Sequence, residues 1–276
     1  MRTSTILITG CSSGIGLYAA RGLHARGHRV FASARRVTDV ERLRAEGLEA
    51  VQLDVDDPDS VAAGVDEVLA HTGGRLDALF NNAGFGLTGA VEDVSREALR
   101  LQLETNLLGA HDLTCRVLPV MRRQGRGRII QCSSVLGLVA FPFRGPYCAS
   151  KFALEALSDC LRQELHGTGI HVVLIEPGPI LSRFRANSLA AFRRHIDPEH
   201  SPHRERYRKT LRRLETEGAA VPFTLGPEAV LKKLVRALES PRPKPRYHVT
   251  VPTHLFAALR RLTTTRGLDR LVGRHL

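Results

Sequence analysis

Cysteine is scarce in this sequence and is not arranged for cross-linking or metal binding. Five cysteines occur in 276 residues, and no two of them form a C-x-x-C pair. An odd and scattered set indicates neither a disulfide framework nor a zinc site, so we expect no bound metal. Free thiols are typical of a reducing compartment, which favours the cytoplasm. The five are Cys11, Cys115, Cys132, Cys148 and Cys160.

Long apolar runs are missing as well. A bilayer-spanning helix needs about 18 or more consecutive apolar residues, and no stretch of that kind occurs. The first residues lack the apolar core of a signal peptide and lead directly into a strand pattern at 3–9. We therefore expect no transmembrane helix, and the cytoplasm again fits.

Lysine is rare although the chain is strongly basic. The formal net charge is +12, yet only five of the 40 basic residues are lysine. Excess positive charge can indicate an anionic partner, whereas a preference for arginine can also reflect coding bias. Because no helix-turn-helix, RNP or zinc-finger pattern is present, we expect no nucleic-acid partner.

The hydrophobic pattern alternates between short strands and helices. Apolar, β-branched runs predict strands at 3–9, 29–34, 51–55, 76–80, 128–132, 171–176 and 246–251. Helical periodicity fills the intervals, including a long helix at 95–123. This alternation predicts an α/β fold of the Rossmann type, a doubly wound parallel sheet of about seven strands.

A glycine-rich junction follows the first strand. The stretch TGCSSGIG at 9–16 has the spacing G-x-x-x-G-x-G. Gly10 permits a tight turn, while Gly14 and Gly16 let the backbone approach a pyrophosphate and let the next helix pack on the sheet. Amides at the helix start bind anionic oxygens. The alternative is an ordinary glycine turn.

The end of the second strand bears on the choice of cofactor. An acidic residue there would bind the ribose 2′-hydroxyl of NAD, but Ala34 occupies the place and Arg35 and Arg36 follow. A guanidinium can hold a 2′-phosphate by two charge-assisted hydrogen bonds, and the Ser12 hydroxyl could add a third. We predict NADP(H). The alternative is that both arginines are solvated residues opening the next helix.

A second group of polar residues carries proton chemistry. Tyr147 and Lys151 are four apart in a helical pattern, so they share one face. A nearby ammonium favours tyrosinate and is expected to lower the Tyr147 pKa, as suits a general acid. Ser134 stands at the carboxyl end of the fifth strand, where ligands bind in open α/β sheets. Asn106 lies inside the helix at 95–123, where it needs hydrogen-bond partners and could simply tie that helix to a strand.

The last third of the chain departs from the alternation. Residues 181–223 are rich in arginine, histidine and proline, and we predict a substrate lid there. A helix at 226–238 and the proline-rich linker 240–245 precede the last strand. We assign 1–252 to a single NADP-binding catalytic domain. The tail at 253–276 is expected to be helical; it could touch a membrane surface, or pack on its own domain or a partner.

Taken together, these motifs resemble the short-chain dehydrogenase/reductase family. They come in the order TGCSSGIG, NNAG at 81–84, Asn106, Ser134, YCASK at 147–151 and PG at 177–178. The resemblance covers about residues 3–183 and continues more loosely to the end. ITGCSSGIGL (8–17) and YCASKFAL (147–154) are similar to 17-beta-hydroxysteroid and retinol dehydrogenases. NAGFG (82–86), LIEPGPI (174–180) and FTLGPEAV (223–230) are more similar to bacterial NADP-dependent aldehyde reductases.

The resemblance implies roles for four catalytic residues. Ser134 would bind the substrate oxygen and Tyr147 would transfer the proton. Lys151 would hold the nicotinamide ribose, and Asn106 would bind a water that links Lys151 to solvent. The implied cofactor contacts are Gly10, Ser12, Ser13, Gly14, Ile15, Gly16, Arg35, Asp54, Val55, Asn82, Ala83, Gly84, Tyr147, Lys151, Pro177, Gly178, Ile180 and Ser182. The family usually has threonine where Ser182 stands, so that contact keeps its hydroxyl but is less secure.

We therefore predict an NADP(H)-dependent oxidoreductase that transfers hydride between nicotinamide and a carbonyl or alcohol carbon of an apolar substrate, reducing aldehydes or ketones. The alternatives are a hydroxysteroid or retinol dehydrogenase, a non-catalytic NADP-binding sensor, or a basic protein that binds surfaces through 183–213 and the tail. The resemblance implies a homodimer, through helices near 95–123 and 150–166, or a homotetramer. The added tail puts the usual tetramer in doubt.

Overall fold

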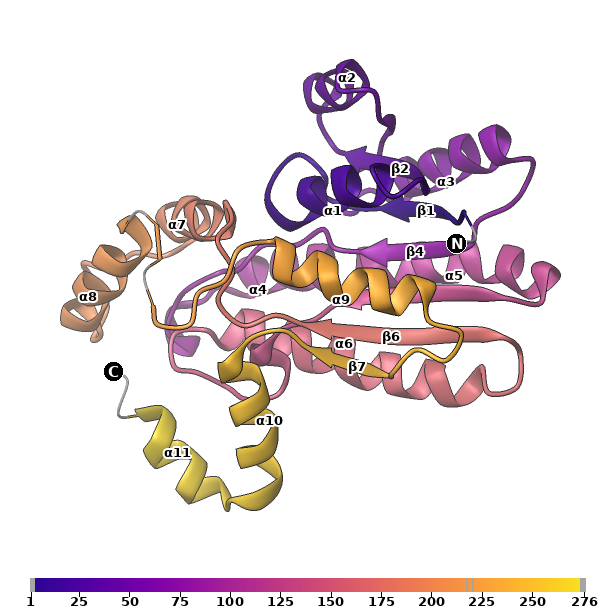
Figure 1. Cartoon of the computed structure of the whole chain (residues 1–276). Coiled ribbons are helices and arrows are strands. Elements are labelled where there is room, and N and C mark those ends of the chain that lie inside the picture. Colours follow the sequence, from indigo (N-terminus) through magenta and orange to yellow (C-terminus); the bar gives the residue numbers. More distant parts are fainter. Residues whose placement is uncertain (1–2, 217, 220, 274–276) are drawn as a thin grey trace.

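A seven-stranded parallel sheet forms the centre of the protein (Figure 1). The computed structural model describes residues 3–216, 218–219 and 221–273. Positions 1–2 of the assigned domain, 217 and 220 of the assigned lid and 274–276 of the tail lie outside these ranges.

The strand order is β3-β2-β1-β4-β5-β6-β7, with every neighbouring pair parallel. The predicted doubly wound α/β fold is confirmed. The strands are β1 (Thr5–Ile8), β2 (Arg29–Ala34), β3 (Glu49–Gln52), β4 (Ala78–Asn81), β5 (Gly127–Cys132), β6 (Ile170–Glu176) and β7 (Arg246–His248).

Helices cover both faces of the sheet and enclose two apolar cores. On one face α1, α2 and α9 bury residues such as Leu23, Val40 and Leu234. On the other face α3 and α5 bury residues such as Val65 and Val117, and α6 closes the layer. The helices are α1 (Gly14–His24), α2 (Val37–Ala45), α3 (Pro58–Thr72), α4 (Arg96–Leu103), α5 (Gly109–Gln124), α6 (Gly145–Glu164), α7 (Phe184–His195), α8 (Arg204–Glu215), α9 (Glu228–Glu239), α10 (Val251–Leu262) and α11 (Thr265–Gly273). Short turns add η1 (Val91–Asp93), η2 (Glu104–Leu108) and η3 (Val135–Gly137).

The largest departures from the predicted strand ranges are at β3 and β7, which each end three residues early. The third strand was expected at 51–55, but β3 begins earlier because Glu49 pairs with Phe31 in register and forms an ion pair with Arg29 at 2.8 Å. Asp54 and Val55 therefore follow the strand rather than end it. The last strand was expected at 246–251, but β7 stops at His248. Pro252, in the first turn of α10, fits a helix start and lacks the amide that a strand would use.

The long helix predicted at 95–123 is interrupted in its middle. It consists of α4, the π-helical turn η2 and α5. Single π-turns inside a helix often occur at functional sites, because they re-aim side chains. Asn106 lies in η2 and is almost fully buried.

The segment predicted as a lid, 181–223, has its own helices and its own core. Figure 1 shows α7 and α8 beyond the carboxyl ends of the strands. Phe192 and Tyr207 are buried there against Leu87 and Phe143 of the main body. The two ends of the segment meet in a parallel bridge between Ile180 and Leu225.

The C-terminal tail forms two helices at the β7 edge of the molecule (Figure 1). Thr253 in α10 and Val272 in α11 are buried, whereas Leu255 and Leu262 are exposed. No helix in the described part of the chain is long and apolar enough to cross a membrane.

Candidate active site

The glycine loop joins β1 to α1 in close contact with the turn after β4. Gly10 has a φ of 71°, a left-handed conformation, and a side chain there would lie 2.9 Å from the Ala83 Cα. A side chain on Gly16 would overlap the Gly10 carbonyl. Asn82 and Ala83 both donate backbone amides to Thr9 Oγ1 at 2.9 Å. The loop is therefore held against the NNAG turn, and only glycine fits between them.

The start of α1 is suited to an anion. Ser13 is the N-cap residue in extended conformation, and its side chain makes no capping hydrogen bond. The first turn of α1 contains no acidic residue, so the helix-start amides keep their partial positive charge uncompensated by side chains. These residues fit the pyrophosphate of a dinucleotide, and Ser12, Gly14 and Ile15 complete the loop.

At the end of β2 the side chains are basic. Arg35 and Arg36 directly follow the strand and are exposed. Arg42 on α2 donates a hydrogen bond of 2.8 Å to the Ser12 carbonyl, which brings a guanidinium to the glycine loop. Arg42 was not predicted from the sequence, because nothing in its spacing from Ser12 indicates the contact.

The residues expected at the adenine lie in the turn after β3. Asp54 Oδ1 accepts a hydrogen bond from the Asp56 amide at 3.2 Å. The Val55 carbonyl lies against Gly109 at the start of α5, where a side chain would overlap it. Both residues thus belong to an ordered turn at the carboxyl edge of the sheet.

Ser134 and Tyr147 bring two hydroxyl groups to one place. Ser134 starts the turn η3 after β5, and its Oγ accepts a hydrogen bond from the Leu136 amide at 3.1 Å. The same hydroxyl lies close enough to the Tyr147 phenol to act on its pKa. The Tyr147 ring meets Phe184 of α7 edge to face, with centroids 5.3 Å apart. An oxygen atom of a ligand could therefore contact both hydroxyls beneath an aromatic ring.

Lys151 lies one turn after Tyr147 on α6 and is almost fully buried. Its Nζ donates to the Cys132 carbonyl at 2.7 Å and lies 5.7 Å from the centroid of the Tyr147 ring. The expected lowering of the Tyr147 pKa is wrong for this arrangement. Burial raises the pKa of Tyr147, and the hydrogen bond from Ser134 only partly offsets it. Burial likewise lowers the pKa of Lys151.

Asn106 connects the π-turn η2 to α6. Its Nδ2 donates to the Phe85 carbonyl at 2.9 Å and to Ser150 Oγ at 3.1 Å, while Oδ1 accepts from the Phe85 amide at 3.1 Å. Ser150 in turn donates to the Tyr147 carbonyl at 2.8 Å. All hydrogen-bonding groups of the Asn106 side chain are thus used, and they hold α6, η2 and the segment after Gly84 together.

The segment after β6 closes the site on the remaining side. The Pro177 carbonyl accepts from the Val135 amide beside Ser134 at 2.8 Å. Gly178 is packed against the Thr250 hydroxyl, which leaves no room for a side chain. Ser182 lies near Gly14, since a side chain on Gly14 would be 3.1 Å from the Ser182 Cβ. The sequence-predicted residues therefore converge on one region at the carboxyl edge of the sheet.

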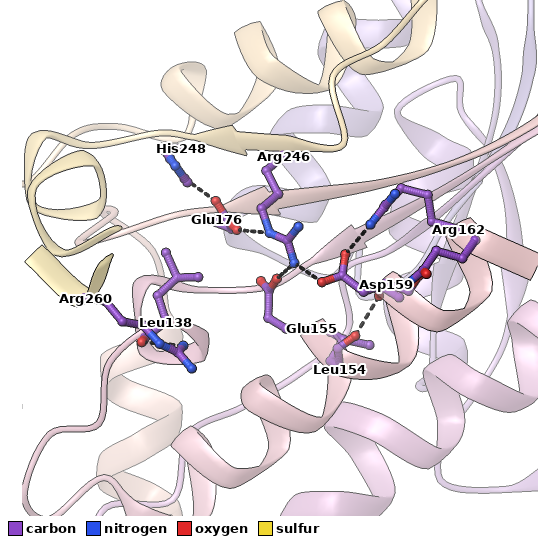
Figure 2. A network of polar contacts seen from close by, with 11 residues as sticks. Leu138, Leu154, Glu155, Asp159, Arg162, Glu176, Arg246, His248 and Arg260 are labelled. Atoms are coloured by element: carbon purple, nitrogen blue, oxygen red, sulfur yellow. Dashed lines mark hydrogen bonds and ion pairs between the residues drawn. The ribbon is translucent and has the colours of Figure 1, made fainter. Parts of the chain in front are cut away.

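A partly buried network of charges, with Glu155 and Glu176 at its buried centre, was not predicted (Figure 2). Arg246 on β7 contacts Glu155 at 2.9 Å, Asp159 at 2.7 Å and Glu176 at 3.3 Å, and Glu176 also bonds His248. Glu155 is four residues after Lys151 on α6, and Glu176 immediately precedes Pro177. Burial and the neighbouring Glu176 raise the pKa of Glu155 to about 7, although Ser133 and Arg246 oppose the shift. Because these residues come from three separate elements, no local motif could have revealed them.

Residues 4–191 match the family described as short chain dehydrogenase. The chain belongs to the short-chain dehydrogenase family. The predicted resemblance is thereby confirmed. A member of this family is an oxidoreductase that acts on CH–OH or C=O groups with a nicotinamide cofactor.

Relatives of this short-chain dehydrogenase span most of its length. It is 45% identical over 268 residues to the uncharacterized oxidoreductase YbbO of Escherichia coli K12, covering 97% of this chain and 93% of that one. It is 37% identical over 265 residues to human 17-beta-hydroxysteroid dehydrogenase type 1, covering 91% and 78%. Among solved structures, a short chain dehydrogenase/reductase of Burkholderia phymatum in complex with NAD superposes with a TM-score of 0.77 at 25% identity, covering 98% and 95%.

Proposed function

We propose that this protein is an NADP(H)-dependent carbonyl reductase for apolar aldehydes or ketones. The observation that carries the proposal is the pair of neighbouring hydroxyls, Ser134 and Tyr147, with Phe184 against the Tyr147 ring. Two adjacent hydroxyls can bind one carbonyl oxygen and stabilise the charge that develops on it. Lys151 and Asn106 lie on the same or the adjoining element and support this geometry.

Tyr147 holds the proton that the reaction requires. A raised pKa keeps the phenol protonated at neutral pH, so Oη donates a proton to the substrate oxygen as charge accumulates there. Ser134 donates its hydrogen bond to the same oxygen. When bound, the nicotinamide supplies the hydride.

Apolar residues around the lid support an apolar substrate. Large, partly exposed hydrophobic side chains lie at or just beyond the two ends of 181–223. They are Leu181, Phe184, Phe223 and Leu225. Exposed apolar groups gathered beside a polar centre are typical of a ligand site. The bridge between Ile180 and Leu225 holds both ends of the lid next to the site.

The basic groups after β2 support NADP(H). No acidic residue directly follows Ala34; Arg35 and Arg36 come next in the chain, and Arg42 contacts the Ser12 carbonyl of the glycine loop. Asp39, the nearest acid on α2, is engaged by Arg42 at 2.8 Å. A 2′-phosphate would find guanidinium groups in this place.

The test is NADPH oxidation with short and long aldehydes, retinal and steroid ketones, run in parallel with NADH and with the Tyr147→Phe variant. We expect turnover of long apolar aldehydes with NADPH. Tyr147→Phe should lower kcat at least about 1000-fold while cofactor affinity stays within about twofold, because it removes only the transferable proton. Tyr18→Phe, an exposed tyrosine on α1, is the control. Turnover retained by Tyr147→Phe would refute the proton-donor role.

A hydroxysteroid dehydrogenase is the second candidate, favoured by the 37% identity to the human 17-beta-hydroxysteroid enzyme over most of this chain. Turnover of steroid ketones in preference to aldehydes in the same panel would support it. Cofactor binding without turnover of any compound would instead favour a non-catalytic sensor.

A further inference from the structure

A cavity of about 690 Å³ lies at the β7 edge of the sheet, separate from Ser134 and Tyr147. It is formed by α9, the proline-rich segment 240–245, β7 and the first turns of α10. Its volume is within the range of small-molecule sites in proteins. The lining residues are Lys233, Val235, Arg236, Glu239, Ser240, Arg242, Lys244, Arg246, Tyr247, His248 and His254.

The walls of this cavity carry uncompensated positive charge. Two of its charged residues already have partners, since Glu239 binds Arg26 and His28, and Arg246 binds the buried carboxylates. Within the part of the chain that the structure describes, the remaining four cations form no ion pair and donate no side-chain hydrogen bond. They are Lys233, Arg236, Arg242 and Lys244.

These four cations come from two different elements, α9 and the segment 240–245, and face one shared space. Burial, together with the neighbouring charges of Arg236, Lys232 and Lys244, lowers the pKa of Lys233. Like charges gathered without partners repel one another and attract anions from solution. His248 and His254, whose rings meet edge to face at 5.1 Å, also line the cavity, and His248 already bonds Glu176.

We propose that this cavity is a binding site for a soluble anion with two adjacent phosphate groups. Arginine and lysine together suit phosphate oxygens, because the guanidinium binds two of them at once and the ammonium acts as a point charge. Four cations on two walls match the charge of a diphosphate better than that of a single carboxylate. The site is distinct from the glycine loop. The loop lies at the start of α1, whereas α9 contacts α1 at Gly22, near the other end of that helix.

The experiment is calorimetric titration of pyrophosphate into the enzyme saturated with NADPH, so that the glycine loop is already occupied. Wild type is compared with Arg242→Gln/Lys244→Gln, which changes two exposed residues of the segment 240–245. The matched control is Arg122→Gln/Arg123→Gln, which removes the same charge from exposed positions at the end of α5. We expect at least about tenfold weaker binding for the cavity variant and a change within about twofold for the control.

A second variant, Lys233→Gln, tests the other wall and should also weaken binding. Absence of binding to wild type at low ionic strength would overturn the proposal, as would equal losses in the cavity and control variants. Vesicles of phosphatidylglycerol are titrated in parallel. If wild type binds these vesicles through Arg242 and Lys244 but does not bind pyrophosphate, the ligand is a lipid headgroup and the soluble anion is excluded.

Discussion

Arg35 is a single residue on which the cofactor preference depends. It follows β2 without an acidic neighbour in the strand, and its guanidinium is exposed. Arg35→Ala should weaken NADPH binding at least about tenfold and change NADH binding by less than about twofold, because only NADPH carries the 2′-phosphate. Fluorescence titration with both cofactors measures the difference. Arg122→Ala, at an exposed site on α5, should affect neither cofactor. Equal losses for the two cofactors would show that Arg35 does not read the phosphate.

Glu155 makes stability depend on pH near neutrality. Its pKa in the folded protein is raised to about 7, against an ordinary value of 4.5. Between these values the folded chain binds more protons than the unfolded chain. The free energy of unfolding should therefore fall as pH rises through this window, by up to about 1.4 kcal/mol per pH unit.

Glu155→Gln removes this titration, so its stability should decline less than that of wild type between about pH 5 and about pH 8. Urea unfolding at several pH values measures the difference. Glu164→Gln, an exposed acid at the end of the same helix, should keep the wild-type slope. Parallel curves for wild type and Glu155→Gln would mean that Glu155 is ionised throughout the range.

At the scale of elements, the glycine loop depends on backbone contact. A side chain on Gly16 would overlap the Gly10 carbonyl, so Gly16→Ala must push α1 away from the loop. We expect cofactor affinity to fall at least about tenfold and stability to fall by about 1–3 kcal/mol. Gly267→Ala in α11 is the control, because its nearest neighbour would be 3.4 Å away and alanine favours helix. Unchanged cofactor binding by Gly16→Ala would show that the loop can relax without consequence.

Helices and strands were predicted well from the sequence where the spacing of the apolar residues and the positions of the turn residues indicated the same boundaries. The strands at 29–34, 128–132 and 171–176 lie close to β2, β5 and β6, because each is an apolar run buried on both faces. The shift of β3 depends on the pairing of Glu49 with its neighbour strand, which no local pattern contains. The helices α7 and α8 were not predicted, since their apolar residues are few and pack into a small core that also needs Leu87 and Phe143.

In the candidate site, too, residues within local sequence motifs were predicted, whereas residues that depend on distant partners were not. Residues in ordered motifs, such as Ser134 and Tyr147, were placed together from the sequence. Arg42 and Arg246 were not, because each acts through a partner far away in the chain. The expected effect of Lys151 on Tyr147 also failed, since burial could not be judged from the four-residue spacing.

At the scale of the whole molecule, the neighbouring elements η2 and α6 leave apolar side chains uncovered. Leu108 in η2 and Leu157 on α6 are 46% and 45% exposed. We expect a homodimer that buries this face, because large exposed apolar patches mark association surfaces. Leu108→Glu/Leu157→Glu should shift the mass measured by light scattering from dimer to monomer. Leu255→Glu/Leu262→Glu removes comparable apolar side chains from the tail and should leave the dimer intact. A monomeric wild type would contradict the expectation.

The bridge between Ile180 and Leu225 has a consequence for how such an enzyme can diversify. The chain leaves the main body and returns to it at neighbouring points, and the residues between pack through a small core on Leu87 and Phe143 of the main body. If these contact positions are matched, the segment could be exchanged without altering the register of β6 or the start of α9. Transplanting the corresponding segment of a relative would change which substrates are accepted, while Ser134, Tyr147 and Lys151 stay in place.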